Sequence, residues 1–232
     1  MAKFIPPFSD ERKPLHTLLP SAAPISVYID PSNYCNFKCN FCFQHFDKIR
    51  DKKLMDIDLF NKLADDLAEF EEPVKMIHLH AFGEPLLNPK FADFIRILKS
   101  KLSDTTKIAT TTNAVKLSAK NAEEIVDAGL NKIHISIYGL NDEQYLKNCN
   151  VKAKFNQIKE NCMYLFSIKK NLHIHIKAMA DFFTKEEQNE FVEIFSPYCD
   201  TIYLDNMTNI WPDIKVTEKA IEKSAPFRFT KW

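Results

Sequence analysis

Strand-like and helix-like patterns of hydrophobic residues alternate along most of the chain. Segments rich in β-branched and aromatic residues predict six strands, at residues 25–30, 74–82, 106–113, 132–140, 172–180 and 201–206. Between the strands, apolar residues recur at helical spacing, as do Phe60, Leu63, Ala64 and Leu67. This periodicity predicts five helices: one around residues 60–67 with Asp56 as its N-cap, and four at residues 89–102, 118–128, 151–170 and 185–195.

The regular alternation of strand and helix implies right-handed crossovers and a parallel sheet. Six such units are fewer than the eight of a closed barrel, so we predict an α/β fold whose parallel strands form a partial (βα)6 barrel. A doubly wound, Rossmann-like sheet is the alternative architecture. It is disfavoured because the three glycines, Gly83, Gly129 and Gly139, cannot form a G-x-G-x-x-G turn, and their spacing excludes a P-loop as well.

Polar residues alternate with apolar ones within several predicted strands. Strands of a parallel sheet that is covered by helices are normally apolar throughout. Because residues two apart share a face and helices cover the outer one, we expect the polar set to point into the barrel lumen. The set comprises His78 and His80; His134, Ser136 and Tyr138; and His173, His175 and Lys177. A polar lumen suits a bound ligand, and the alternative for each histidine is a hydrogen-bonded structural role.

These patterns divide the chain into three regions. Residues 1–24 contain five prolines and little periodicity, which predicts an extended N-terminal arm. Residues 25–208 hold all the predicted strands and helices and form the core. Residues 209–232 form a C-terminal tail or the start of a truncated extension.

Charge and composition exclude several classes of partner. The chain has 31 basic and 31 acidic residues, and only four of the basic residues are arginines. This balance argues against a nucleic-acid-binding protein, which would present a basic face. No apolar run approaches the roughly 18 residues of a membrane span, and the N-terminus lacks the apolar core of a signal peptide. We therefore expect a cytoplasmic protein with no membrane partner.

Three of the six cysteines, Cys35, Cys39 and Cys42, lie within eight residues, soon after the first predicted strand. Clustered thiols in a chain without a signal peptide indicate zinc or an iron–sulfur cluster. A zinc site normally needs a fourth ligand, for which His45 is available, but C-x-x-x-C-x-x-C is not the spacing of a common zinc module. A cubane held by three cysteines leaves one iron open to a substrate or cofactor.

The C-x-x-x-C-x-Φ-C motif, with Phe41 before its last cysteine, resembles the signature of the radical S-adenosylmethionine (radical SAM) enzymes. The resemblance extends over about residues 25–206. It includes Gly83-Glu84-Pro85 after the second strand and Thr111-Thr112-Asn113 at the end of the third. The family core is a (βα)6 partial barrel, in agreement with the pattern of predicted elements.

This resemblance implies a set of cofactors and residue roles. Cys35, Cys39 and Cys42 would bind one [4Fe–4S] cluster, and S-adenosylmethionine (SAM) would contact Phe41, Gly83, Glu84, Asn113, Ser136 and Lys177. In the family, reductive cleavage of SAM yields methionine and a 5′-deoxyadenosyl radical that abstracts hydrogen from a substrate. An electron donor of the flavodoxin or ferredoxin type is also implied. The lumen groups that we expect to contact substrate, as candidate catalytic residues, are His80, Tyr138, His175 and Asp205.

Two departures from the family pattern bear on the binding detail. Pro85-Leu86-Leu87-Asn88-Pro89 resembles the SPASM/twitch-type subgroup, but no cysteine follows Cys199, so we expect one cluster and no cysteine-rich extension. Phe82 and Ala114 stand where many relatives have glycine. If either backbone position needs a positive φ, the side chain costs about 1 kcal/mol there.

No motif specifies the substrate. A small molecule, sugar or nucleotide is favoured because no peptide-recognition domain is evident. The alternatives are a peptide-modifying radical SAM enzyme and a non-catalytic metal-binding scaffold protein.

Overall fold

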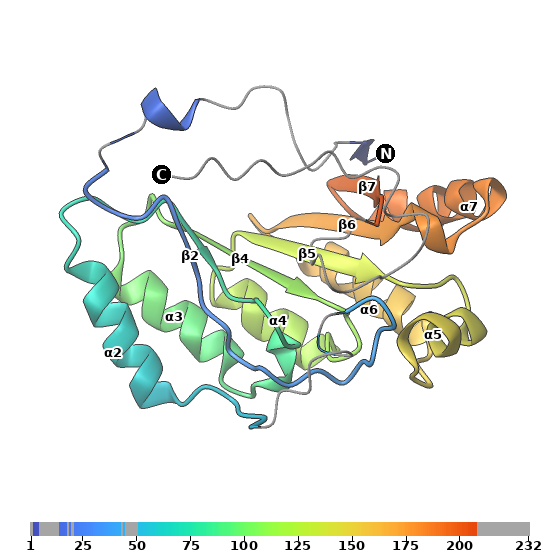
Figure 1. The fold of residues 1–232 in the computed structure, drawn as a ribbon, viewed down its shortest axis with the longest axis horizontal. Coiled ribbons are helices and arrows are strands. Elements are labelled where there is room, and N and C mark those ends of the chain that lie inside the picture. The colour runs from blue at the N-terminus through green and yellow to red at the C-terminus, as the bar shows by residue number, and fades with distance from the viewer. Residues whose placement is uncertain are drawn as a thin grey trace, which may run out of the picture.

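The computed structural model describes residues 2–4, 14–17, 19, 21–42, 44 and 51–207. Within them, seven parallel strands form one sheet in the order β1-β7-β6-β5-β4-β3-β2 (Figure 1). The strands are β1 (Lys3–Phe4), β2 (Ser26–Tyr28), β3 (Met76–His78), β4 (Lys107–Thr112), β5 (Lys132–Ile137), β6 (His173–Met179) and β7 (Thr201–Asp205). From β2 to β7 each strand pairs with the next one in the chain, as in a barrel that is not closed.

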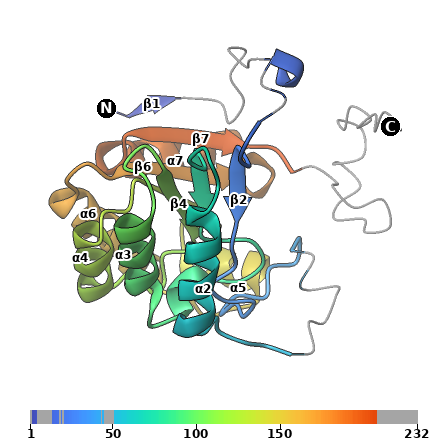
Figure 2. The ribbon, with the colours of Figure 1, turned by 90° about the vertical axis from the view of Figure 1, so that its left-hand side faces the viewer.

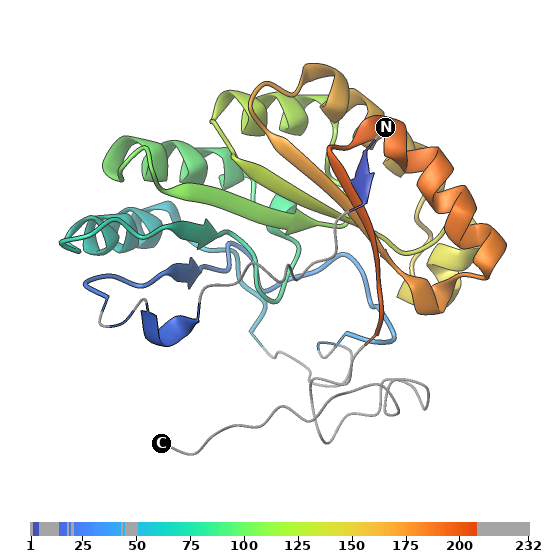
Figure 3. The ribbon, with the colours of Figure 1, turned by 90° about the horizontal axis from the view of Figure 1, so that it is seen from above.

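Helices cover one face of the curved sheet (Figures 2 and 3). They are α2 (Ile57–Ala68), α3 (Phe91–Lys101), α4 (Ala119–Asp127), α5 (Asp142–Cys149), α6 (Phe155–Ile168) and α7 (Lys185–Phe195). Short 3-10 turns are η1 (Leu15–Thr17), η2 (Pro85–Leu87), η3 (Ala180–Phe182) and η4 (Ser196–Tyr198). The α/β class and the partial-barrel architecture predicted from the sequence are confirmed. None of the described helices is long and apolar enough to cross a membrane.

Side chains at the helix ends explain where several helices start and stop. Asp56 accepts a hydrogen bond from the backbone N–H of Asp58 at 2.8 Å and is the N-cap that the sequence predicts for α2. Ser118 caps α4 in the same way, and Thr184 forms a capping box with Glu187 at the start of α7. Gly129 follows α4 with a φ of 87°, a conformation that glycine adopts without strain.

The two faces of the sheet differ in chemistry. Ile133, Ile135 and Ile137 of β5 are fully buried and belong to the main hydrophobic core. Their alternates face the concave side, where the rings of His134 and His175 lie 5.0 Å apart. The sheet therefore has an apolar face under the helices and a polar face in the lumen, as the alternation of polar residues predicts.

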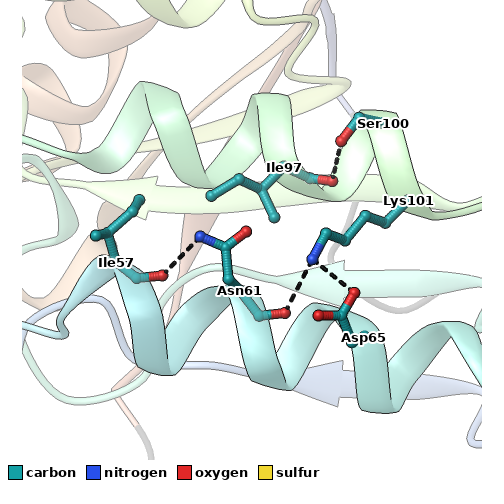
Figure 4. A network of polar contacts seen from close by, with 6 residues as sticks. All are labelled: Ile57, Asn61, Asp65, Ile97, Ser100 and Lys101. Carbon is teal, nitrogen blue, oxygen red and sulfur yellow. Dashed lines mark hydrogen bonds and ion pairs between the residues drawn. The ribbon is translucent and has the colours of Figure 1, made fainter.

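Polar contacts join α2 and α3 on the outside of the molecule (Figure 4). Lys101 Nζ donates to Asp65 Oδ1 at 2.6 Å and to the carbonyl oxygen of Asn61 at 3.3 Å. Beneath them, the rings of Phe60 and Phe94 stack at 4.1 Å and are completely buried. Because the stacked pair removes far more apolar area from water than the half-exposed ion pair, burial provides most of the stabilisation between these helices.

The sheet has one strand more than the six predicted. Lys3 and Phe4, from the arm predicted over residues 1–24, pair with Thr201 and Ile202 of β7. The backbone N–H of Lys3 donates to the carbonyl oxygen of Asp200 at 3.1 Å. An edge strand exposes unpaired backbone groups, and two extended residues are enough to bind some of them. Residues 5–13 of the arm and the predicted tail at 209–232 lie outside the described residues.

A second difference is that the helix predicted at 151–170 begins only at Phe155, after a separate helix, α5. The side chain of Asn141 caps the N-terminus of α5, and Asn150 ends the helix in the left-handed conformation with a φ of 50°. Only Tyr145, Asn148 and Cys149 are buried in this helix. With so few buried positions, α5 lacks the apolar stripe by which a helix is recognised in a sequence.

Candidate active site

Cys35, Cys39 and Cys42 lie on the loop that follows β2, and Cys39 is the most deeply buried of the three. Burial raises the pKa of the Cys35 thiol to about 12, and negative charge on Glu84, Cys39 or Cys42 adds to this increase. Burial also raises the pKa of Cys42. Cys39 contributes to the raised pKa of both Cys35 and Cys42, so the loop brings together three sulfurs that release their protons when a metal binds.

The loop is attached to the C-terminal end of α5 on both sides of Cys39. The backbone N–H of Lys38 donates to the carbonyl oxygen of Cys149 at 3.0 Å, and that of Asn40 donates to Asn148 at 3.1 Å. The Asn40 side chain adds a bond to the carbonyl oxygen of Lys147 at 2.7 Å. Carbonyl groups at a helix C-terminus have no hydrogen-bond partner within the helix. The loop donates hydrogen bonds to these carbonyl oxygens of α5, and the same bonds hold the loop in place.

The turn after β3 packs tightly on the start of this loop. A Cβ on Gly83 would lie 1.8 Å from the carbonyl oxygen of Ser32, so only glycine fits. The backbone N–H of Glu84 donates to the carbonyl oxygen of Tyr34 at 2.9 Å. Asp30 Oδ2 accepts from the backbone N–H of Phe82 at 3.2 Å. The predicted cofactor residue Gly83 therefore lies directly against the cysteine loop.

The carboxylate of Glu84 is buried and accepts hydrogen bonds from other groups of the protein. It accepts hydrogen bonds from Leu86 N at 3.2 Å, Thr112 Oγ1 at 2.6 Å and Asn113 N at 2.8 Å. Burial raises the pKa of this carboxyl to about 7, and the three hydrogen bonds oppose that increase. Glu84 thus ties the turn after β3 to the end of β4.

Asn113 continues the same network to the cysteine loop. Its Nδ2 donates at 2.9 Å to Oδ1 of Asn36, which is the residue after Cys35. The following residue, Ala114, is buried and has a φ of 61°, the left-handed conformation in which a Cβ costs about 1 kcal/mol. Phe82 has no positive φ. Of the two departures from glycine, Ala114 is therefore the one that strains the backbone.

Ser136, Tyr138 and Lys177 line one small pocket at the carboxyl ends of β5 and β6. Burial keeps the pKa of the Tyr138 hydroxyl well above its ordinary value, and the neighbouring Ser136 side chain opposes this increase. The Phe41 ring lies 5.6 Å from that of Tyr138 and 5.0 Å from that of Phe182. The predicted residues Ser136, Tyr138 and Lys177 thus lie beside Phe41, a predicted residue of the cysteine loop.

The other residues predicted to contact substrate are more dispersed. His80 follows β3, and burial lowers its pKa to about 4. Burial lowers the pKa of His175 to about 4 as well, and its Nδ1 lies 2.8 Å from Thr201 Oγ1. Asp205 ends β7 beside Met179, and no contact of its side chain with Ser136, Tyr138 or Lys177 is seen.

Several residues of the site carried no recognisable signal in the sequence. Asn36 completes the network, but a lone asparagine is common in loops, and the Thr111-Thr112-Asn113 motif does not indicate that Thr112 binds Glu84. His134 is predicted from the strand alternation to face the lumen, but it is not among the candidate site residues. Cys149 carries no such signal, because the helix that bears it was not predicted.

Two buried polar atoms near the cysteine loop, Asp30 Oδ1 and His80 Nδ1, have no hydrogen-bond partner among the described residues, as expected at a ligand-binding position. Among the described residues, the buried side-chain polar atoms without a hydrogen-bond partner are Asp30 Oδ1, His80 Nδ1 and the Tyr145 hydroxyl. Asp30 and His80 follow β2 and β3, at the end of the sheet that carries the cysteine loop. Buried polar atoms normally have partners, so a bound molecule with polar groups fits this position.

Zinc and an iron–sulfur cluster place different demands on the three thiols. No three His, Cys, Asp or Glu side chains in the described part of the chain are placed to hold one metal ion. A tetrahedral zinc site needs sulfurs that converge on one point at about 2.3 Å. A cubane instead offers separate irons to separate thiolates. His45, the candidate fourth zinc ligand, lies outside the described residues.

Comparison with known families agrees with this geometry. The family model described as the Radical SAM superfamily matches residues 29–196, well over half of the chain. The chain belongs to the radical SAM superfamily. Membership implies an iron–sulfur cluster and SAM as cofactors, and the matched residues contain the cysteine loop, Gly83-Glu84, Asn113 and strands β3 to β6.

Curated relatives and a solved structure support the assignment. Over 112 residues the chain is 31% identical to a tungsten-containing aldehyde ferredoxin oxidoreductase cofactor-modifying protein of Pyrococcus furiosus, covering 48% of this chain and 30% of that protein. Over 187 residues it is 28% identical to the GTP 3′,8-cyclase of Staphylococcus haemolyticus, covering 71% and 52%. The fold matches that of Streptococcus suis SuiB bound to S-adenosylmethionine, with a TM-score of 0.67 and 17% identity over 82% of this chain and 42% of SuiB. This radical SAM chain thus spans about half or less of each of these proteins.

Proposed function

We propose that the chain is the catalytic core of a radical SAM enzyme, in which Cys35, Cys39 and Cys42 hold a [4Fe–4S] cluster. When bound, cluster and SAM supply a 5′-deoxyadenosyl radical that abstracts hydrogen from a substrate. The observation that carries the proposal is the convergence of three motifs. The cysteine loop, Gly83-Glu84 and Asn113 are far apart in the sequence, yet direct hydrogen bonds join them.

The residues around the loop have distinct roles in this proposal. The backbone of Gly83 and Glu84 would receive the amino group of SAM, with Asp30 Oδ1 as an additional buried acceptor. Asn113 would approach the ribose, and Ser136 and Lys177 the carboxylate. Phe41 and Tyr138 would exclude water from the reacting groups, because their rings pack together beside the loop. The electron would come from a flavodoxin or ferredoxin type of donor in the cytoplasm.

Unpaired lysines in the lumen favour an anionic small-molecule substrate over a peptide. Lys132 and Lys177 form no ion pair with any described residue. Lys132 is partly buried, and this burial lowers the pKa of its amino group. Such a cation is costly without a counter-charge. A nucleotide or sugar phosphate would provide one, with His80, Tyr138, His175 and Asp205 as further substrate contacts.

The test is anaerobic reconstitution with iron and sulfide, followed by dithionite and SAM and chromatographic detection of 5′-deoxyadenosine. We expect the product from the wild type and from Cys162→Ala, whose thiol is buried on α6, but not from Cys39→Ala. A wild type that carries a full cluster and yields no 5′-deoxyadenosine would overturn the enzymatic proposal in favour of a scaffold. Uptake of zinc in place of iron would overturn the cluster assignment.

The same assay tests the substrate class. GTP and sugar phosphates are added in separate reactions, beside guanosine, unphosphorylated sugars and a short unstructured peptide. We expect the phosphorylated compounds to accelerate 5′-deoxyadenosine formation and the uncharged ones to leave it at the basal rate. Acceleration by the peptide alone would show a peptide-modifying enzyme and refute the anionic class.

A further inference from the structure

The cysteine loop and the end of α5 together carry a local surplus of positive charge. The loop residues 35–42 and the segment 146–157, which runs from the end of α5 into α6, contain no aspartate or glutamate, although acidic and basic residues are equal in number over the whole chain. The four lysines of these two segments are exposed, and only Lys154 forms an ion pair, at 3.2 Å with Asp142. The three that form no ion pair with any described residue are Lys38, Lys147 and Lys152.

Hydrogen bonds of the backbone bring these three lysines together. Lys38 forms two bonds at 3.0 Å, from its N–H to the carbonyl oxygen of Cys149 and to its own carbonyl oxygen from Asn150 Nδ2. Lys147 and Lys152 lie on either side of this pair in the sequence. The three exposed lysines therefore gather at the end of α5, beyond the arrowhead of β5 in Figure 1, and we call them the basic face.

An exposed apolar side chain lies beside the basic face. Leu146 is 50% exposed and lines a shallow hollow together with Lys152. Asp142 and Glu143 also line this hollow, from the start of α5, and Lys154 neutralises the charge of Asp142. The basic face therefore keeps a net positive charge and has apolar area next to it. Protein–protein interfaces combine these two features, as a charged rim around an apolar centre.

The basic face also lies over one of the proposed cluster ligands. Lys38 and Asn40 flank Cys39 in the sequence and are exposed, whereas Cys39 itself is only 8% exposed. The backbone N–H groups of both flanking residues donate to carbonyl oxygens at the end of α5, so the segment is held in place on both sides of Cys39. A protein bound to the basic face would contact the immediate neighbours of a residue that holds the cluster.

We infer that the basic face is the docking surface for an acidic electron-carrier protein that reduces the cluster. The inference rests on the proposed function, in which one electron enters the cluster for each SAM molecule that is cleaved. The carrier is oxidised by one electron and the cluster is reduced by one, so the step needs no further reactant. The partner is a small protein that holds a flavin or an iron–sulfur group near a surface rich in carboxylates.

Lysines suit a brief encounter of this kind. Electron-transfer partners bury small interfaces, and opposite charges on the two surfaces raise their rate of association. The strongly hydrated ammonium group of lysine attracts a partner at a distance, whereas arginine favours desolvated, bidentate pairs. A nucleic acid is the other polyanion to consider. Bidentate recognition of phosphate depends on arginine, and the basic face contains none.

The test compares two routes by which electrons reach the cluster of the reconstituted protein. Formation of 5′-deoxyadenosine is measured with a reduced flavodoxin and, separately, with a reduced ferredoxin, each over a range of carrier concentrations and at low and high ionic strength. Dithionite is the parallel electron source, because a small reductant needs no protein docking surface. Iron and sulfide contents are determined for every protein.

Three variants separate docking from other effects of charge. The charge-reversed variant combines Lys38→Glu, Lys147→Glu and Lys152→Glu. The charge-preserving variant combines Lys38→Arg, Lys147→Arg and Lys152→Arg. The matched control makes the same change of charge at three exposed lysines at the amino ends of β1, β3 and β4, which form no ion pair with any described residue. It combines Lys3→Glu, Lys75→Glu and Lys107→Glu.

At low ionic strength we expect the charge-reversed variant to lose about tenfold in kcat/KM for the carrier. High ionic strength should bring the wild type close to this variant, because salt screens the attraction between exposed charges. The charge-preserving variant and the matched control should stay close to the wild type. The iron content and the dithionite-driven rate should be the same in all four proteins.

Equal carrier kinetics in the wild type and the charge-reversed variant, or an equal loss in the matched control, would refute the docking role. A dithionite-driven rate that falls as far as the carrier-driven one would refute it too, because the lysines would then support the site itself. Binding of a single-stranded RNA oligonucleotide by the wild type alone, with unchanged carrier kinetics in the charge-reversed variant, would identify a nucleic-acid surface instead.

The two electron sources also distinguish this inference from the proposed function. A wild type that carries a full cluster and yields no 5′-deoxyadenosine with dithionite would refute the proposed function, and the inference with it. A wild type that is active with dithionite but with neither carrier would refute the inference alone.

Discussion

The carboxylate of Glu84 accepts a hydrogen bond from the backbone N–H of Asn113 at 2.8 Å, across 29 residues of sequence. Glu84 follows β3 and Asn113 follows β4, so the bond joins the ends of two adjacent strands. A side-chain hydrogen bond then continues from Asn113 to Asn36 in the cysteine loop. One buried carboxylate thus fixes the relative position of the residues proposed to bind the amino group and the ribose of SAM.

Replacing Glu84 by glutamine should destabilise the fold. The carboxylate accepts three hydrogen bonds, and the amide nitrogen of glutamine can accept none of them. One backbone or hydroxyl donor is left without a partner in a buried site, at a cost of about 2 kcal/mol. Urea unfolding measures the change. Glu190→Gln, on the exposed surface of α7, is the control and should unfold as the wild type does. Equal stability of both variants would contradict the structural role of the carboxylate.

Gly83→Ala should disturb the cysteine loop. The added Cβ would lie 1.8 Å from one backbone oxygen, of Ser32, and 2.6 Å from another, of Tyr34. Backbone cannot rotate away as a side chain can, so the loop must shift, at a cost of about 3 kcal/mol. We expect a lower unfolding midpoint and less iron bound after reconstitution. Ala81→Ser changes an exposed neighbour in the same turn and should affect neither. Full iron content in Gly83→Ala would show that the loop tolerates the shift.

The predicted strands illustrate what periodicity can show. The run of β-branched and apolar residues at 132–140 was enough to locate β5, but the strand itself ends at Ile137. Tyr138 follows the strand and lines the site, so composition alone overestimates the length of the strand. The alternation also gave the lumen face correctly, because the side-chain period of a strand is strictly two.

The contacts within the site cannot be predicted from the sequence and are seen only in the structure. Glu84 could be read as a motif residue, but nothing in the sequence shows that its carboxylate is consumed by Thr112 and Asn113. These bonds depend on the register of β3 against β4, which local patterns do not encode. The position of Cys149 depends in the same way on α5, a short helix stabilised by its caps and by tertiary contacts more than by an apolar stripe.

The lumen histidines should make the fold sensitive to acid. Burial lowers the pKa of His134 to about 2, while in the unfolded chain it returns to about 6.5. Below pH 6.5 the unfolded chain therefore binds a proton that the native state does not, and stability falls as the pH falls. His134→Gln should reduce the loss of unfolding free energy by about 1.4 kcal/mol for each pH unit below about 6. Urea unfolding at pH 7, 6 and 5 measures the slope.

The exposed His16 offers a matched control for this dependence. His16→Gln is made and unfolded in parallel, because it changes an exposed histidine and leaves the lumen untouched. An identical slope in wild type and His134→Gln would show that His134 accepts a proton in the native state. The lumen would then be more open to water than the burial of its histidines indicates.

We expect Asn150 to stabilise the attachment of the cysteine loop to α5 in two ways. It combines a left-handed φ of 50° with a hydrogen bond from Nδ2 to the carbonyl oxygen of Lys38 at 3.0 Å. Asn150→Ala strains the backbone by about 1 kcal/mol and loses the bond, which contributes about 1 kcal/mol more. Asn150→Gly loses the bond but relaxes the strain. The expected order of stability in urea is wild type, then glycine, then alanine, and a glycine variant less stable than alanine would show that the left-handed turn is not what Asn150 provides.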